Sequence, residues 1–384
     1  MSRVAVSASV LRWARERAGH RASALPQRFP KLAQWESGEE QPTLRQLEAF
    51  AKATLTPLGY FFQSEPPEDR LPIPEYRTVA DTAVRRPSPD LLETVYAMQR
   101  RQDWMREFLI EEGQSPFPFV GSARPAADPT AIAGEMRELL RIDADWAQRH
   151  STWSDALRAL RRAAEDAGIL VVANGIVGNN THRKLDPTEF RGFVLVDDYA
   201  PLVFVNAADS KAAQMFTFAH EIAHIWFGQS GVFDLRDLQP ASDEVEQACN
   251  RVAAEFLIAE SELHATWPEV RREPEPFQAL ARRFKVSVLV AARRALDLRL
   301  MTKAEFLDFY QAYQADERRR AAPGSGGGDF YANQDVRVGR RFASAVIQAA
   351  REGRLLYRDA YRLMGLWGVT FDHYAETLGL GSSR

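Results

Sequence analysis

His220 and His224 stand four positions apart in the segment HEIAH, which matches the pattern H-E-x-x-H. In a helix, side chains at i and i+4 lie one above the other on one face, so both imidazoles can reach the same metal ion. Three protein ligands and one water are the usual arrangement around a catalytic zinc. Glu221 is not a ligand in this pattern, but it would lie beside the metal-bound water and take its proton.

The residues around this motif favour a long core helix. No Pro or Gly interrupts the run 210–227, and the flanking stretches 216–219 and 225–227 are mostly apolar. Such a helix would bury most of its surface and turn one polar stripe toward a cleft. This context favours a metal site over a chance pair of core histidines.

A third ligand must come from the chain after the motif. The segment 243–260 has the pattern of a second helix, and Glu246 falls among its apolar positions. A carboxylate on the buried side of a helix is costly unless it is paired or bound to metal, so we favour Glu246, with Glu244 as second choice. The other acidic residues considered are Asp234, Asp237, Asp243 and Glu255.

Three further residues are assigned no ligand role. Glu255 is expected to be a solvated or capping charge, and His264 a surface histidine in a charged, proline-flanked stretch. Cys249 is expected to be a small buried helix residue rather than a nucleophile. As the only cysteine it can form no internal disulfide, which fits a reducing compartment.

The segment 191–260 closely resembles the ImmA/IrrE metallopeptidases. It contains RGFVLVDDYAPLVFVN, FTFAHEIAHIWFGQSG and EVEQACNRVAAEFL, in that order. The resemblance implies that His220, His224 and Glu246 hold the metal and that Glu221 is the general base. The proline that follows the last motif in that family is missing here, where Ile258-Ala259-Glu260 stands, and this change concerns a helix end more than the site.

The resemblance also implies an activity. It predicts a zinc-dependent endopeptidase, with Mn²⁺ as another suitable ion, that cleaves a regulatory protein such as a repressor or antitoxin. His182 and Tyr199 are candidate donors to the oxyanion by residue type alone. The alternative is a DNA-binding transcriptional regulator or antitoxin-like protein with a vestigial metallopeptidase domain. Glu221 discriminates between them, because a purely structural metal site would not need it.

Hydrophobic patterning predicts an α+β, mostly helical fold. Short apolar runs at 169–173, 193–196 and 202–205 are typical of strands, and we expect a small sheet packed on the HEIAH helix of a zincin-like core. The expected parts are a degenerate helix-turn-helix region (1–64), a linker and amphipathic helix (65–128), the peptidase core (129–276), a helical cap or helix-turn-helix-like segment (277–315) and a C-terminal helical extension (329–384), with a flexible break at 316–328.

The first 64 residues resemble part of an XRE-type helix-turn-helix region. Trp35 to Gly38 matches the close of its recognition helix, and Pro42 to Leu44 the start of the next one. The stretch 19–35 is too short for the usual two helices and turn, and 29–33 is largely apolar. We therefore expect any DNA binding to be weak. The residues that could meet phosphates include Arg12, Arg15, Arg17, Arg28 and Lys31.

Overall composition fits a cytoplasmic enzyme. The chain has 384 residues, 45% hydrophobic, and a net charge of −3, which implies no general attraction to nucleic acid or anionic membranes. No apolar run is long enough to span a membrane, and the arginine-rich start lacks the apolar stretch of a signal peptide.

Overall fold

The computed structural model describes residues 3–68, 71–76, 87–233, 243–315 and 334–380. The chain forms two compact units. One comprises residues 1–72 and 82–96, and the other comprises residues 73–81 and 97–384. The helix α5 (Pro89–Glu111) runs from the first unit into the second. The break expected at 316–328 lies outside the described residues.

The N-terminal unit is helical and has its own aromatic core. Trp13, Trp35, Phe50 and Phe61 are all buried. The helix α4 begins with a capping box, in which Thr43 and Gln46 exchange side-chain-to-backbone hydrogen bonds. The elements of this unit are α1 (Ala8–Arg17), η1 (Gly19–Ala24), α2 (Leu25–Arg28), α3 (Leu32–Ser37), α4 (Leu44–Thr54) and η2 (Leu58–Phe62).

A five-stranded mixed sheet forms the centre of the second unit, in the order β1-β7-β5-β6-β2. The three predicted strands are confirmed as β2 (Leu170–Asn174), β5 (Gly192–Leu195) and β6 (Leu202–Asn206). Sequence patterning missed the other strands, which are β1 (Glu75–Tyr76), β7 (Gly231–Phe233), and the separate pair β3 (Ile176–Val177) and β4 (Asn180–Lys184), the last of which is exposed and polar.

One of the two-residue strands, β1, lies in the stretch expected to be a linker. Within 65–88, residues Glu75–Tyr76 pair in parallel with β7 and therefore form an edge of the sheet. Strand β2 forms the other edge and pairs in parallel with β6, while β5 runs antiparallel to both of its neighbours. Two-residue strands carry too little periodicity to be recognised from sequence.

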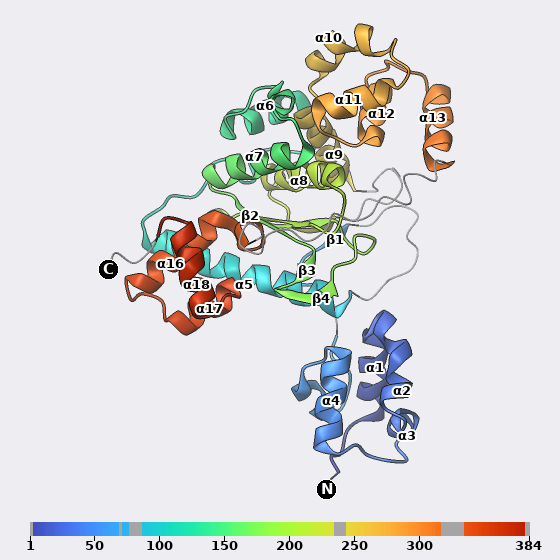
Figure 1. Ribbon diagram of the computed structural model, residues 1–384, viewed down its shortest axis with the longest axis vertical. Coiled ribbons are helices and arrows are strands. Elements are labelled where there is room, and N and C mark those ends of the chain that lie inside the picture. Colours follow the sequence, from blue (N-terminus) through green and yellow to red (C-terminus); the bar gives the residue numbers. More distant parts are fainter. Residues whose placement is uncertain (1–2, 69–70, 77–86, 234–242, 316–333, 381–384) are drawn as a thin grey trace. The chain divides into compact units, whose positions relative to one another are not determined.

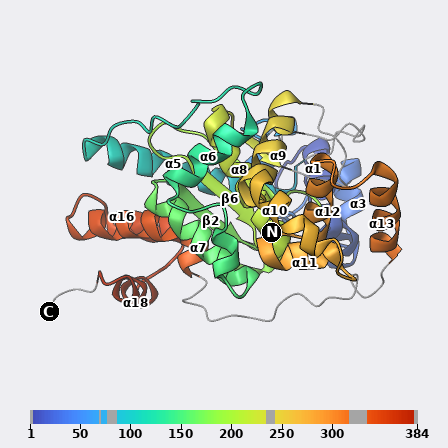
Figure 2. The ribbon, with the colours of Figure 1, turned by 90° about the horizontal axis from the view of Figure 1, so that it is seen from above.

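Helices cover the sheet on both sides. Figure 1 shows α7 (Trp153–Asp166) and α8 (Lys211–Phe227) on one side, and α16 (Arg340–Arg351) with the second half of α5 on the other. The view in Figure 2 looks onto the side of the sheet that carries α7 and α8. On this side, α6 (Pro129–Leu139) and α9 (Glu244–Leu257) lie next to α8. The mostly helical α+β fold is therefore confirmed, with the apolar faces of α6 to α9 meeting the sheet in one core.

The second predicted helix ends earlier than expected. Helix α9 stops at Leu257, because Ile258 adopts a non-helical backbone (φ −133°, ψ 86°), and α10 (Glu260–Val270) begins after Ala259. Glu255 is not solvated as expected but is buried, where it forms an ion pair with Arg294. Its carboxylate also accepts the Glu260 N–H at the start of α10, so the expected capping role is present.

The remaining elements follow α10 and are also helical. Val286 and Ser287 lie at the turn between α11 and α12, and Ser287 caps α12. The elements are α11 (Pro276–Phe284), α12 (Val288–Asp297), α13 (Lys303–Ala315), the π-helical turn η4 (Asp335–Gly339), α17 (Tyr357–Met364) and α18 (Val369–Thr377), with η3 (Trp146–Arg149) between α6 and α7.

Candidate metal centre

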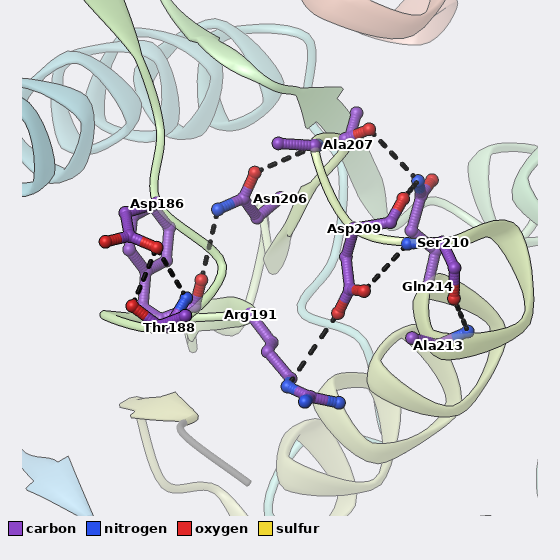
Figure 3. Close-up of polar contacts among 11 residues, drawn as sticks. Asp186, Thr188, Arg191, Asn206, Ala207, Asp209, Ser210, Ala213 and Gln214 are labelled. Atoms are coloured by element: carbon purple, nitrogen blue, oxygen red, sulfur yellow. Dashed lines mark hydrogen bonds and ion pairs between the residues drawn. The ribbon is translucent and has the colours of Figure 1, made fainter. Parts of the chain in front are cut away.

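Helix α8 carries the HEIAH segment and is fixed at its N-terminus by polar contacts. The Ser210 hydroxyl accepts the Ala213 N–H and caps the helix. Gln214 in the first turn donates to the carbonyls of Ala207 and Asp209, which ties the helix to the end of β6 (Figure 3). The same figure shows Asn206 donating to a backbone carbonyl, which belongs to Phe190.

The C-terminus of α8 is held by the connection 114–128. The backbone N–H groups of Gly121 and Ala123 donate to the carbonyls of Ile225 and Trp226, the last turn of the helix. A Cβ at Gly228, whose φ is 69°, would lie 3.0 Å from the Cα of Gly121, so this approach requires glycine. Both ends of the helix are therefore fixed, and the histidines between them have a defined position.

Three ligand-type side chains converge in the interior. The Nε2 atoms of His220 and His224 are 3.1 Å apart. Glu246, on α9, places one carboxylate oxygen 3.1 Å from the Nε2 of His220 and the other 3.0 Å from that of His224. All three side chains are buried. The structure thus brings together the two histidines and the carboxylate that the sequence favoured.

Glu246 is oriented by the start of α9. The Asp243 carboxylate caps this helix by accepting the N–H groups of Val245 and Glu246. Burial by itself would raise the pKa of the Glu246 carboxyl, but His220 and His224 outweigh burial and hold the pKa well below its usual range. A carboxylate is therefore maintained at this position.

Asn250 is a polar residue at the site to which sequence reasoning gave no role. It lies one helical turn after Glu246 on α9, and its Oδ1 is 3.1 Å from the Nδ1 of His220. An amide oxygen can only accept, so this contact places the His220 proton on Nδ1 and directs the Nε2 lone pair toward Glu246. The signal was present in the sequence, because positions 246 and 250 share one helix face.

Glu221 lies beside this cluster and is fully buried. Among the described residues, neither of its carboxylate oxygens has a hydrogen-bond partner. Burial, with the nearby Glu246 charge, raises the pKa of the Glu221 carboxyl well above its usual value. A buried acid without a protein partner is costly, which suggests that it serves a bound group.

Gly192 is the residue of strand β5 that lies next to the Glu221 carboxylate. A Cβ built on Gly192 would lie 2.9 Å from the Glu221 Oε1, 2.6 Å from the Thr217 Cγ2 and 2.9 Å from the Phe204 carbonyl oxygen. The first two atoms belong to α8 and the third to β6. Gly192 therefore permits the sheet to approach the helix at the level of the HEIAH segment.

The donor set fits a divalent metal ion. Burial lowers the pKa of His220, and its Nε2 lies 3.1 Å from another imidazole nitrogen and from a carboxylate oxygen. Lone pairs and a negative charge facing each other at about 3 Å repel unless a cation lies among them. Two imidazoles and one carboxylate are ligands typical of catalytic zinc.

Cys249 is a further ligand-type side chain near the cluster. Its Sγ and the ring nitrogens of His220 and His224 lie within 4.8 Å of one another. The Glu246 oxygens approach both histidines more closely, and burial raises the pKa of the Cys249 thiol well above its usual value. Glu246 and Cys249 are therefore both candidates for the third ligand, and the closer contacts of Glu246 favour the carboxylate.

Other sequence candidates lie elsewhere. Glu244 is exposed on α9, which argues against it as a ligand. His264 lies after the end of α9, in α10, and its side chain is half-exposed with Nε2 3.6 Å from the Glu260 Oε1. Asp234 and Asp237 fall outside the described residues. His182 is exposed on β4, and Tyr199 lies in the β5–β6 turn beneath the Arg106 guanidinium.

The basic side chains proposed for DNA contact are partly engaged within the N-terminal unit. Arg15 forms an ion pair with Glu36, and Lys31 forms one with Glu40. The other three interact locally: Arg12 donates to the Ala8 carbonyl, Arg17 donates to the Leu55 carbonyl, and the Arg28 guanidinium lies over the Phe29 ring.

Comparison with known proteins identifies two segments. A family model described as the IrrE N-terminal-like domain, a peptidase family, matches residues 164–296, which supports a relationship to the ImmA/IrrE family. A domain of unknown function, DUF8813, matches residues 338–377. No curated protein and no solved structure matches the chain. Among the described helices, none is both long and apolar enough to cross a membrane.

Proposed function

We propose that this protein is a metal-dependent endopeptidase with a zincin-like centre between α8 and α9. One observation carries the proposal. Glu221 is buried beside the His220–His224–Glu246 cluster, and neither of its oxygens has a partner among the described residues. A structural metal site requires ligands alone, whereas hydrolysis also requires a group that accepts a proton.

Different residues of the chain bind the metal ion and transfer the proton. His220, His224 and Glu246 would hold a divalent ion, with zinc as the first choice and Mn²⁺ as another. Such an ion, when bound, lowers the pKa of water and polarises a carbonyl group. Glu221 takes a proton from the attacking water onto its carboxylate and then gives it to the leaving amine nitrogen. Asn250 keeps the His220 ring in the orientation and tautomer that binding needs.

The shape of the site also supports hydrolysis. Gly192 lets β5 lie close to Glu221 without a side chain between them, so the sheet borders the carboxylate on one side. Low polarity around this carboxylate raises its affinity for a proton, which suits a group that must accept one and later release it. A substrate polypeptide is the reactant class that the peptidase family match suggests.

For the substrate we propose a repressor or antitoxin protein. This choice rests on the resemblance of 191–260 to ImmA/IrrE metallopeptidases. The competing function is a DNA-binding regulator with a vestigial metallopeptidase domain. Two of the five basic residues considered for DNA contact are paired with Glu36 and Glu40, which weakens that alternative.

The test is cleavage of a candidate repressor encoded beside this gene. Purified full-length protein should cleave it, and a chelator should stop cleavage. Glu221→Gln should retain the metal and reduce the rate by about a hundredfold or more, because it removes the proton acceptor and keeps the shape. His264→Ala changes a half-exposed histidine and is the matched control. A Glu221→Gln protein that cleaves at the wild-type rate would refute the assignment.

A further inference from the structure

Helix α7 presents a basic face away from the core. Arg158, Arg161, Arg162 and Glu165 follow the spacing i, i+3, i+4 and i+7, so they lie along one side of the helix. Other positions of the helix are buried in the apolar core. Those buried residues are Ala156, Leu157, Leu160 and Ala164.

The C-terminal extension forms the opposite wall of a cavity on this face. The cavity has a volume of about 350 Å³ and is lined by the four α7 residues, Val171 of β2, and Asp335, Val336 and Arg340. A neighbouring hollow of about 480 Å³ shares Arg162, Glu165 and Arg340 and adds Asp166, Arg341 and Ser344. Figure 2 shows α7 and α16 as neighbours, and the two helices are in contact.

The η4–α16 segment contacts strand β2 and helix α7 closely. Gly339, with a φ of 85°, ends η4, and a Cβ there would lie 2.8 Å from the Val171 carbonyl oxygen. In addition, the Glu165 carboxylate accepts the Arg341 N–H at the start of α16, at 3.2 Å. These contacts make the cavity a formed feature of the second unit.

One of the five arginines that line these hollows, Arg158, forms an ion pair, with Asp155. Among the described residues, no carboxylate forms an ion pair with the guanidinium groups of Arg161, Arg162, Arg340 or Arg341. The Arg341 Nε is buried without a hydrogen-bond partner. Burial lowers the pKa of the half-buried Arg161 to about 10, although the Glu165 charge acts in the opposite direction.

Glu165 marks a position for negative charge inside the cavity. It receives an N–H from the first turn of α16, where the helix dipole favours an anion. Burial nevertheless raises the pKa of its carboxyl to about 7. Apart from the Arg158–Asp155 pair, four arginines thus face three acidic groups, Glu165, Asp166 and Asp335, in a chain whose net charge is −3.

We propose that this cavity between α7 and the η4–α16 segment, together with the adjoining hollow that Arg341 lines, binds a small phosphate-bearing molecule. Guanidinium groups form bidentate hydrogen bonds with phosphate oxygens, and here they come from two segments far apart in sequence. The volume suits a small ligand of nucleotide size. A concave site favours such a molecule over a nucleic acid backbone. Because the ligand contacts both walls, it would join the peptidase-like core to the extension.

Isothermal titration calorimetry of the full-length protein tests this inference, with inorganic pyrophosphate and ATP as probes at constant ionic strength. Both should bind, and tighter binding of ATP would show that the cavity also accepts a base or sugar. Phosphates also chelate metal ions, so the His220→Ala/His224→Ala protein is titrated in parallel. It should bind both probes with the wild-type affinity, which separates this site from the metal centre.

Three variants locate the binding site. Arg161→Gln and Arg341→Gln should each weaken pyrophosphate binding by about tenfold or more, because each removes a charge-assisted contact. Glu165→Gln keeps an acceptor for the Arg341 N–H but removes the competing charge, so it should strengthen binding by about threefold or more. Arg272→Gln changes an exposed arginine outside the cavity and is the matched control.

Several outcomes would overturn the inference. One is the absence of binding by pyrophosphate and ATP at about 1 mM. Another is binding that Arg161→Gln and Arg341→Gln leave unchanged while circular dichroism shows native folding. Duplex DNA that binds through these arginines when neither small probe binds would assign the surface to nucleic acid instead.

Discussion

The Nδ1 of His220 lies 3.1 Å from the Oδ1 of Asn250, so an amide on α9 fixes the tautomer of a histidine on α8. Asn250→Ala should weaken metal affinity by about 10- to 100-fold, because the ring loses the partner that orients it. Asn250→Asp keeps an acceptor and should retain most of the affinity. Competition titration with a metal indicator measures both, and equal affinity in the alanine variant would contradict this positioning role.

Glu246 and Cys249 offer alternative third ligands, and substitution separates them. Glu246→Gln should reduce metal content strongly, since its two oxygens lie 3.1 and 3.0 Å from the histidine nitrogens. Cys249→Ala should leave the metal content near one ion per chain, because burial raises the pKa of the thiol and disfavours the thiolate that binds metal. Elemental analysis of both proteins decides. Loss of metal from the cysteine variant alone would reverse the assignment.

Gly192→Ala should damage the site and the fold together. The added Cβ would lie within 3 Å of atoms of Glu221, Thr217 and Phe204, one of them a backbone oxygen. We expect the free energy of unfolding to fall by about 1–3 kcal/mol, as in other overpacked cores. Gly134→Ala on α6 meets nothing within 4 Å and is the control. Denaturant unfolding measures the free energy of unfolding of both variants. If the Gly192→Ala protein is as stable as the control, β5 can shift to accommodate the added methyl group.

Glu165 should make stability depend on pH. Its folded pKa of about 7 exceeds its usual value, so the folded state holds this proton more tightly than the unfolded state does. The contribution is complete below about pH 4.5 and is lost as pH rises through 7, by at most about 3 kcal/mol. The charged groups around it are Arg161, Arg162 and Asp166 on α7, and Asp335, Arg340 and Arg341 on the opposite wall. The titratable Tyr374 on α18 is also near, and burial raises the pKa of its hydroxyl.

Comparison with Glu165→Gln isolates this effect from other titrations. Unfolding free energies of the two proteins are measured from pH 5 to pH 8. As pH rises, the free energy of unfolding of the wild type should fall relative to that of the Glu165→Gln variant. A constant difference across this range would exclude a raised pKa at Glu165.

DNA binding by the N-terminal unit should be weak and strongly salt-dependent. Arg15 and Lys31 are paired with Glu36 and Glu40, and the apolar side chains of Phe29 and Leu32 face the core rather than a groove. Gel shifts with random and upstream-promoter DNA at two salt concentrations test this expectation. Removal of residues 1–64 should leave metal content unchanged. Promoter-selective binding at physiological salt would favour the regulator hypothesis.

The sequence by itself determined the features that depend on local periodicity. The i, i+4 spacing fixed His220 and His224 on one helix face, and the apolar pattern of α9 placed Glu246 on its buried side. Strands β2, β5 and β6 were recognisable because each is a short, wholly buried apolar run. These properties are encoded within a few neighbouring residues.

Only the tertiary structure decided which distant groups meet. The contact of Asn250 with His220, the approach of Gly192 to Glu221, and the burial of Glu255 against Arg294 all join separate elements. The arginine-lined cavity likewise needs α7 and α16, which lie far apart in the chain. Periodicity shows which face of an element is apolar, but it does not show which partner that element packs against, because packing is set by the whole core.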